Sequence, residues 1–174
     1  KSLIKIMTSE PSAGLVDCRV FDNRIDFYMA QARLESRSKF KFFTGNTGRM
    51  SVNYARETMA DQAIKAGMDF ILMMDDDQIV PADMFERLYK VIEEQKADVV
   101  SPMVTQRFPP FNPVMWKQTW YDGGKISNTF IEDYEPNSIV ECDAVGFGVV
   151  LIRVSMLAKI KMPRFFSNTY LGED

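Results

Sequence analysis

The sequence predicts an α/β fold with a mostly parallel central sheet and helices on both of its faces. Four short apolar segments have the length and composition of buried strands: residues 3–7, 40–43, 70–74 and 98–104. Three longer segments between them repeat apolar residues at helical spacing: residues 16–37, 50–66 and 81–95. Strands that alternate with helices along a chain pair in parallel, and the connecting helices then cover the sheet.

The boundaries of the first elements follow from polar residues and breakers. The first strand is expected to end at the polar residues after Met7 and at Pro11, and the second at the turn cluster 44–48. In the first helix the apolar residues at helical spacing are Val16, Val20, Ile25, Met29 and Ala32. The second helix is expected to bury Val52, Ala55, Met59 and Ala63, and to stop at Gly67.

The second half of the chain is less regular. Pro81 suits the first position of the third helix. Residues 105–137 form a long segment rich in proline, glycine and aromatic residues, and such a segment is usually functional or carries small strands. Two apolar pieces follow within residues 140–154, and a short helix is expected over 155–160. No internal repeat or domain boundary is evident, so we expect one domain over 1–174.

Composition excludes several classes of protein. The chain has 174 residues, 46% hydrophobic and 26% charged, as expected for one globular domain, and its net charge of −3 argues against nucleic-acid binding. Histidine is absent, which excludes Ser-His-Asp and Cys-His catalysis and histidine metal ligands. Cys18 and Cys142 do not form a disulfide or zinc pattern, and the longest apolar stretch, 145–152, is too short to cross a bilayer. We therefore expect a cytoplasmic protein without a transmembrane segment.

Three consecutive aspartates, Asp75, Asp76 and Asp77, follow the apolar run 70–74 directly. Ligands of open α/β sheets bind at the carboxyl ends of such strands. Two unit charges 4 Å apart repel by about 4 kcal/mol at an effective dielectric constant of ~20, so three ionised carboxylates favour a bound cation. Oxygen ligands favour Mg²⁺ or Mn²⁺. The alternative is a solvated acidic loop that caps the next helix.

Several motifs occur together in one order along the chain: residues 50–56 (MSVNYAR), 68–77 (MDFILMMDDD), 81–85 (PADMF), 97–102 (ADVVSP), 145–153 (VGFGVVLIR) and 172–174 (GED). This ordered set resembles the nucleotide-sugar glycosyltransferases of the GT-A fold, especially the family 2-like proteins common in bacteria and phages. The resemblance implies a Rossmann-like GT-A fold. It also implies a nucleotide-binding half over 1–104 and an acceptor and donor-sugar half over 105–174, truncated at the C-terminus.

The resemblance also implies roles for the aspartates. Asp77 would bind the metal ion that bridges the donor diphosphate. Asp75 would lie near the ribose or the metal, and Asp76 beside them would contact the donor.

Further donor-binding residues follow from the same resemblance. Thr8, Ser9 and Glu10 would form the nucleoside edge of the pocket, with a simple turn after the strand as the alternative. Arg56 would face the diphosphate or brace the aspartates, although Glu57 stands where the family usually has asparagine. Gly146 and Gly148 would lie beside the donor sugar, or mark a strand bulge.

The last two residues resemble the Glu-Asp motif of the family, so Asp174, with Glu173, would act as the general base in an inverting reaction. A frayed acidic terminus is the alternative. Trp116, in the long segment, could stack on a sugar ring or pack in a small core.

The expected function is therefore metal-dependent glycosyl transfer, with Mn²⁺ or Mg²⁺ as cofactor. The sugar would pass from a nucleoside-diphosphate sugar to a hydroxyl of a glycan, lipid or protein acceptor. Two alternatives remain open: a nucleotidyltransferase that makes nucleotide sugars, and a non-catalytic domain whose acidic pocket binds a ligand or is phosphorylated. The sequence does not specify the sugar, the base, the acceptor, the stereochemistry or the oligomeric state.

Overall fold

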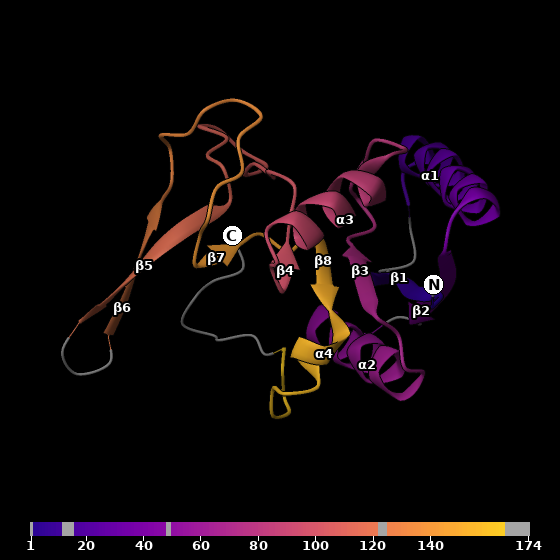
Figure 1. The fold of residues 1–174 in the computed structure, drawn as a ribbon. Helices are drawn as coiled ribbons and strands as arrows, with labels where there is room; N and C mark the ends of the chain where they lie inside the picture. The colour runs from indigo at the N-terminus through magenta and orange to yellow at the C-terminus, as the bar shows by residue number, and fades with distance from the viewer. Residues whose placement is uncertain (1, 12–15, 48–49, 122–124, 166–174) are drawn as a thin grey trace.

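The computed structural model describes residues 2–11, 16–47, 50–121 and 125–165. Its central sheet contains β1 (Ile4–Pro11), β2 (Phe40–Thr47), β3 (Phe70–Met74), β4 (Val99–Val100) and β8 (Val149–Arg153). Its helices are α1 (Cys18–Arg37), α2 (Val52–Lys65), α3 (Met84–Glu94) and α4 (Val154–Leu157). The strand order is β2-β1-β3-β8-β4, with helices on both faces (Figure 1), which confirms the predicted α/β class.

The sheet is mostly parallel, with one reversed strand. β1 pairs in parallel with β2 and β3, whereas β8 pairs antiparallel with both β3 and β4. The carboxyl ends of β1, β2 and β3 and the beginning of β8 therefore lie along the same edge of the sheet. The pairing of Met74 with Val149 places the start of β8 beside the end of β3.

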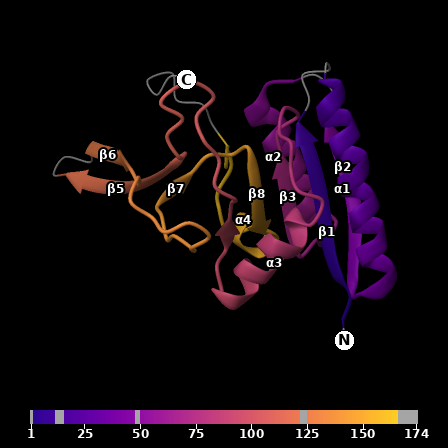
Figure 2. The same cartoon turned by 90° about the horizontal axis from the view of Figure 1, so that it is seen from above.

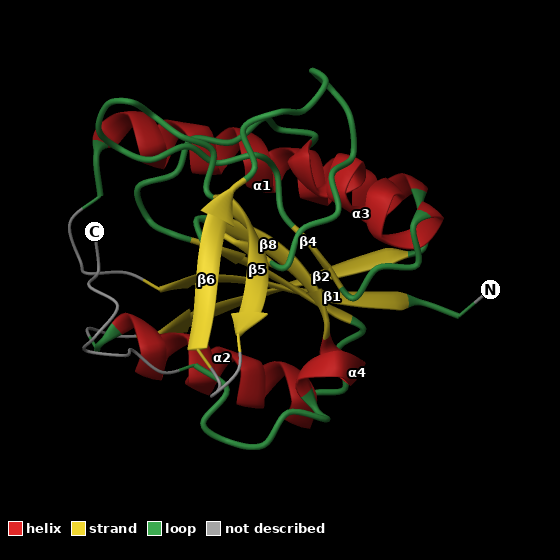
Figure 3. Cartoon of the chain, turned by 90° about the vertical axis from the view of Figure 1, so that its left-hand side faces the viewer, coloured by secondary structure: helices red, strands yellow, loops and turns green. Residues whose placement is uncertain are grey.

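Alternation along β3 divides the core into two layers. Phe70, Leu72 and Met74 pack with residues of α1 and α3, and Ile71 and Met73 pack with residues of α2 and α4. Figure 3 shows the two pairs of helices on opposite sides of the sheet. All five side chains are buried, because a strand covered by helices on both faces has no solvated side.

The first helix buries a different face from the one that its apolar spacing suggested. Of the apolar residues that predicted this helix, Val20 alone is buried, while Val16, Ile25, Met29 and Ala32 are exposed. The buried face of α1 consists of Val20, Arg24, Phe27, Gln31 and Leu34. The spacing predicted a helix correctly, but two polar residues lie on its inner face because both have partners there: Arg24 bonds Glu10, and Gln31 bonds Thr8. In α2 the expected burial is confirmed for Ala55, Met59 and Ala63 but not for Val52.

The first two strands are longer than predicted. β1 continues to Pro11 and β2 to Thr47, paired in parallel over their whole length. The polar residues expected to end β1 stay in the strand because their side chains find partners. Gly45, expected in a turn, lies in β2, where an added Cβ would lie 3.2 Å from Sδ of Met7.

The long segment after β4 forms most of a second sheet. β5 (Met115–Tyr121) and β6 (Lys125–Phe130) form a hairpin, and β7 (Ala144–Val145) pairs with β5. This small sheet lies beside β8, at the end of the molecule remote from α1 (Figures 1 and 2). β4 is shorter than the strand expected over 98–104, and the helix expected over 155–160 spans Val154–Leu157. Within the described ranges, no helix has the length and apolar character needed to span a membrane.

The double-sided burial of β3 predicts a large cost for truncation. Leu72→Ala should lower the free energy of unfolding by about 2–5 kcal/mol, because it leaves a cavity between the sheet and two helices. Chemical denaturation measures the change in the free energy of unfolding. The matched control is Leu3→Ala, at an exposed position, which should change this free energy by less than about 0.5 kcal/mol. Equal effects of the two changes would contradict the two-layer core.

Candidate active site

The three aspartates lie at the edge of the sheet where the parallel strands end. β3 ends at Met74, and Asp75, Asp76 and Asp77 continue the chain beyond the sheet. The ends of β1 and β2 and the first residues of β8 lie along this edge, so the loop is surrounded by α1, α2 and the chain before β8. This is the position where open α/β sheets bind ligands.

Asp75 is fixed by contacts from three parts of the chain. Its backbone N–H donates to the carbonyl of Gly148 at 2.8 Å. Its own carbonyl accepts from the guanidinium of Arg24 in α1 at 2.8 Å, and its carboxylate accepts from Arg56 in α2, also at 2.8 Å. The position and direction of the carboxylate are therefore set by the packing of α1, α2 and β8.

Arg56 lies in a confined position. Its guanidinium stacks on the ring of Phe147 at 4.4 Å from the ring centre, and its side chain is 16% exposed. Burial raises the pKa of the Asp75 carboxyl above its usual range, Arg56 acts against this shift, and Asp77 and Asp76 add to it. The positive charge of Arg56 thus offsets part of the repulsion between Asp75 and the carboxylates of Asp76 and Asp77.

Asp76 and Asp77 line a cavity of about 490 Å³ between their loop and the beginning of α1. The other lining residues are Asp17, Arg19, Val20, Ile79 and Arg107. Asp77 forms an ion pair with Arg107, and its second oxygen accepts from the amide of Gln78 at 2.9 Å. The cavity walls therefore carry both acidic and basic groups, and the room is sufficient for a small polar ligand.

Arg107 was not expected at this site from the sequence. It stands 30 residues after Asp77 in the sequence, in an irregular segment that reaches the aspartate loop only through the fold. A single arginine in such a segment gives no periodic signal. Its position became evident from the structure alone.

The residues at the end of β1 have mainly internal partners. The hydroxyls of Thr8 and Ser9 are buried and contact Gln31 and Met59, so neither side chain faces the cavity. Glu10 accepts from Arg24 at 3.0 Å and from the hydroxyl of Tyr28. Burial and this contact with Glu10 raise the pKa of the Tyr28 hydroxyl. The end of β1 thus ties the sheet to α1.

Gly146 and Gly148, near β8, lie where neighbouring side chains leave little room for a Cβ atom. A Cβ on Gly146 would lie 2.8 Å from Cγ1 of Val114, and one on Gly148 would lie 3.1 Å from Cδ of Gln78. Each glycine therefore allows another part of the chain to approach closely, and Gly148 does so directly beside Asp75.

Trp116 lies in β5, and its ring packs against Phe130 at 5.5 Å between ring centres. It is not among the residues that line the cavity. Glu173 and Asp174 lie outside the described residues. Within the described ranges, no three Cys, Asp or Glu side chains converge as a complete set of metal ligands.

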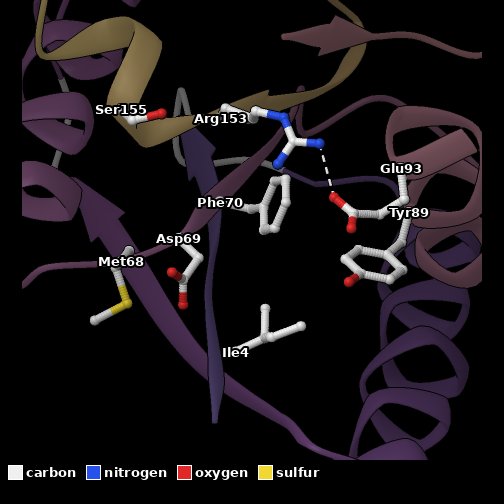
Figure 4. Close-up of a pocket in the computed structure, with 8 residues that line it drawn as sticks. All are labelled: Ile4, Met68, Asp69, Phe70, Tyr89, Glu93, Arg153 and Ser155. Carbon is white, nitrogen blue, oxygen red and sulfur yellow. Dashed lines mark hydrogen bonds and ion pairs between the residues drawn. The ribbon is translucent and has the colours of Figure 1, made fainter. Parts of the chain in front are cut away.

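A second cavity, of about 290 Å³, lies at the opposite edge of the sheet, near the beginnings of β1 and β3 (Figure 4). Arg153 crosses it above the ring of Phe70 and pairs with Glu93 at 2.7 Å. The same guanidinium donates to the carbonyls of Ile92 and Ala97, near the end of α3. Arg153 therefore fastens the end of β8 to the end of α3, and its donors are directed at these protein acceptors.

Comparison with known families adds to this geometry. The sequence profile described as Glycosyl transferase family 2 matches residues 25–154, which is more than half of the chain. The chain belongs to glycosyl transferase family 2. This membership confirms the resemblance drawn from the ordered motifs, and it makes the protein a member of a family of transferases. No match was found among curated proteins.

Comparison with solved structures supports the fold of this family 2 chain. A197 from STIV is 19% identical, with 94% of this chain and 72% of that chain covered and a TM-score of 0.55. Two further structures match more weakly. 4-diphosphocytidyl-2C-methyl-D-erythritol synthase from Anaerococcus prevotii DSM 20548 is 11% identical, with 90% of this chain and 72% of that chain covered and a TM-score of 0.39. A glycosyltransferase involved in the glycosylation of the major capsid of PBCV-1 is 10% identical, with 90% of this chain and 62% of that chain covered and a TM-score of 0.37. The TM-scores of these two are too low to support an argument about this chain. The likeness to A197 supports the Rossmann-like GT-A fold.

Breaking the confined ion pair between Arg56 and Asp75 should lower the free energy of unfolding by an amount that depends on pH. Arg56→Gln should lower the free energy of unfolding by about 1.5–3 kcal/mol at neutral pH, because a partly buried carboxylate loses its charged partner. The matched control is Arg87→Gln in α3, whose exposed ion pair with Asp83 just before that helix should contribute less than about 1 kcal/mol.

The sign of the pH dependence follows from the raised pKa of Asp75. Its carboxyl contributes stability that is present below the unfolded pKa and is lost as the pH rises through the folded pKa. Arg56→Gln raises the folded pKa further, so the difference between variant and parent should grow with rising pH and shrink in acid. Denaturation at several pH values measures it, and a difference that grows in acid would contradict the ion pair.

Proposed function

We propose that this family 2 chain transfers a sugar from a nucleoside-diphosphate sugar to a hydroxyl of a glycan, lipid or protein acceptor. The observation that carries the proposal is the position of the aspartate loop. Three carboxylates follow β3 at the carboxyl edge of the sheet, and two of them, Asp76 and Asp77, line a cavity that also presents Arg19 and Arg107. Acidic groups suit a divalent ion, and guanidinium groups suit the phosphates of the donor.

Asp77 and Asp75 are the residues that we propose to hold Mn²⁺ or Mg²⁺. Mg²⁺ is commonly bound by one or two carboxylates, substrate phosphates and water, and this mode of binding does not require a complete set of protein ligands. The proposal is supported by the carboxylate of Asp77, which lines the cavity, whereas the Asp75 carboxylate is held toward Arg56 and is not among the lining residues. A bound ion would neutralise negative charge on the departing nucleoside diphosphate.

The remaining residues would orient the donor and move one proton. Asp75 and Asp76 would contact the donor, with Arg56 holding Asp75 in place. Glu10 would act indirectly, because it positions Arg24 against the carbonyl of Asp75. Asp174, with Glu173 beside it, would take the proton of the acceptor hydroxyl as that oxygen bonds the anomeric carbon and the bond from the sugar to phosphate breaks.

Arg107 gives this site a feature of its own. Its guanidinium is ion-paired with Asp77, the carboxylate that we propose to bind the metal. A metal ion that binds Asp77 would therefore compete with Arg107. Arg107 lines the cavity, so a displaced guanidinium would be within reach of a phosphate bound there and could form paired hydrogen bonds with it. We therefore infer that Arg107 exchanges Asp77 for the donor diphosphate when metal and donor bind together.

The first test is nucleotide binding with and without metal. Isothermal titration of a panel of nucleoside diphosphates should show binding with Mn²⁺ that is lost on chelation. Asp77→Asn should weaken it at least about tenfold, which corresponds to 1.4 kcal/mol. Arg87→Gln, remote from the cavity, serves as control. Binding that is indifferent to chelation would remove the metal role of Asp77, and no binding by any nucleotide would remove the proposed donor class.

The second test separates the two roles of Arg107. Arg107→Gln should raise the affinity for Mn²⁺ alone, because the competing cation is gone, and lower the affinity for a nucleoside diphosphate in saturating Mn²⁺. Titration of each ligand measures both effects, again with Arg87→Gln as control. If Arg107→Gln leaves the affinity for Mn²⁺ unchanged while the parent protein binds nucleotide normally, Arg107 does not compete with the metal for Asp77. The assignment of the donor would stand in that case.

A further inference from the structure

The outer face of α1 carries an unpartnered apolar stripe. Phe21, Ile25 and Met29 follow one another at intervals of four residues and are 61%, 49% and 51% exposed. At about 100° per residue, Ala32 and Ser36 continue the same stripe toward the end of the helix, and both are exposed. We call these five residues the outer stripe. Three large apolar side chains in a row on a solvated helix face are typical of an interaction surface.

The outer stripe changes in size along the helix. Its first half presents the large side chains of Phe21 and Ile25, and its second half presents only the small side chains of Ala32 and Ser36. Met29 lies between the two halves. A helix face with large side chains in one half and small side chains in the other is complementary to the same face of a second copy that runs antiparallel to it.

A charged stripe beside it shows the same asymmetry. Asp22 and Asp26 lie in the first half of α1, and Arg33 and Arg37 lie in the second half, all on one flank of the outer stripe by helical spacing. Arg19, in the first turn of the helix, shares this flank, but its charge is paired with that of Asp17 just before the helix. In the part of the chain that the structure describes, Asp22, Asp26 and Arg33 form no ion pair. Arg37 has one exposed contact, to Glu86 at 3.6 Å. The flank has no net charge, which favours a protein partner over an anionic membrane surface.

Both asymmetries are satisfied by the same operation. When two α1 helices pack antiparallel about a two-fold axis, Asp22 faces Arg37 of the second copy and Asp26 faces Arg33. The midpoint of both pairs falls between residues 29 and 30, so a single axis serves both. The same axis places Phe21 and Ile25 against the small half of the second copy's outer stripe, and the two Met29 side chains near the axis.

We propose that a second copy of this chain docks on the outer stripe, giving a homodimer through antiparallel α1 helices. An interface of this kind is isologous, because the same surface serves both partners. α1 lies at the end of the molecule remote from the β5–β6 hairpin (Figures 1 and 2), so the pairing leaves that hairpin accessible in both copies. One helix from each copy gives a contact at the lower end of specific interfaces, and the dimer should dissociate on dilution.

The test is sedimentation velocity of the chain over a range of concentrations, without nucleotide or metal. The parent protein should show a reversible dimer that weakens with salt. Asp26→Arg and Arg33→Asp should each raise the dimer dissociation constant at least about tenfold, because each places like charges together in two symmetry-related pairs. Glu94→Arg on α3 is the control and should leave the constant unchanged; circular dichroism checks that each variant is folded.

The decisive variant combines Asp26→Arg with Arg33→Asp. In the proposed dimer, residue 26 of one copy meets residue 33 of the other, so the double reversal restores opposite charges and should restore dimerisation. A parent protein that stays monomeric at every concentration would overturn the proposal. A dimer that tolerates the single reversals, or one that the double reversal fails to restore, would assign dimerisation to another surface and overturn it equally. Nucleotide binding is measured separately, so the outcome is independent of the proposed function.

Discussion

Three hydrogen bonds converge on Asp75, and the arrangement of the candidate site depends on them. Gly148, before β8, accepts from its backbone N–H, Arg24 of α1 donates to its carbonyl, and Arg56 of α2 donates to its carboxylate. These partners come from both helical layers and from the residue just before the one reversed strand, β8. The end of β3 is therefore held in place by the whole fold, and the next two aspartates leave the sheet from a fixed point.

Charge balance at this edge is supplied by the protein itself. From the sequence we expected the adjacent carboxylates to favour a bound cation, and the structure provides Arg56 for Asp75 and Arg107 for Asp77. Repulsion between the aspartates is therefore not sufficient evidence for a metal. The two arginines differ in setting, since Arg56 is confined against Phe147 whereas Arg107 is largely exposed. An exposed pair is easily exchanged for another partner, and a confined one is not.

Most of the fold could be predicted from the sequence because its signals are local. The run 70–74 and the alternation of strands and helices gave the sheet and its layers, and the ordered motifs gave the family. Three features could not be predicted in this way. The polar residues Thr8 and Ser9 stay in β1 because of partners distant in the sequence, α1 buries Arg24 and Gln31 for the same reason, and Arg107 reaches Asp77 only through the fold. A local pattern carries no information about such long-range pairing.

The reversed strand has a consequence for the order in which the molecule can assemble. Among the residues that the structure describes, β4 pairs with β8 and with no other strand of the central sheet, and β8 separates it from β3. During synthesis on the ribosome, β1, β2 and β3 can associate early, whereas β4 has no strand to pair with until about fifty more residues have emerged. The nascent chain therefore keeps one side of β3 open until β8 arrives, and the last step of sheet formation also completes the surroundings of Asp75.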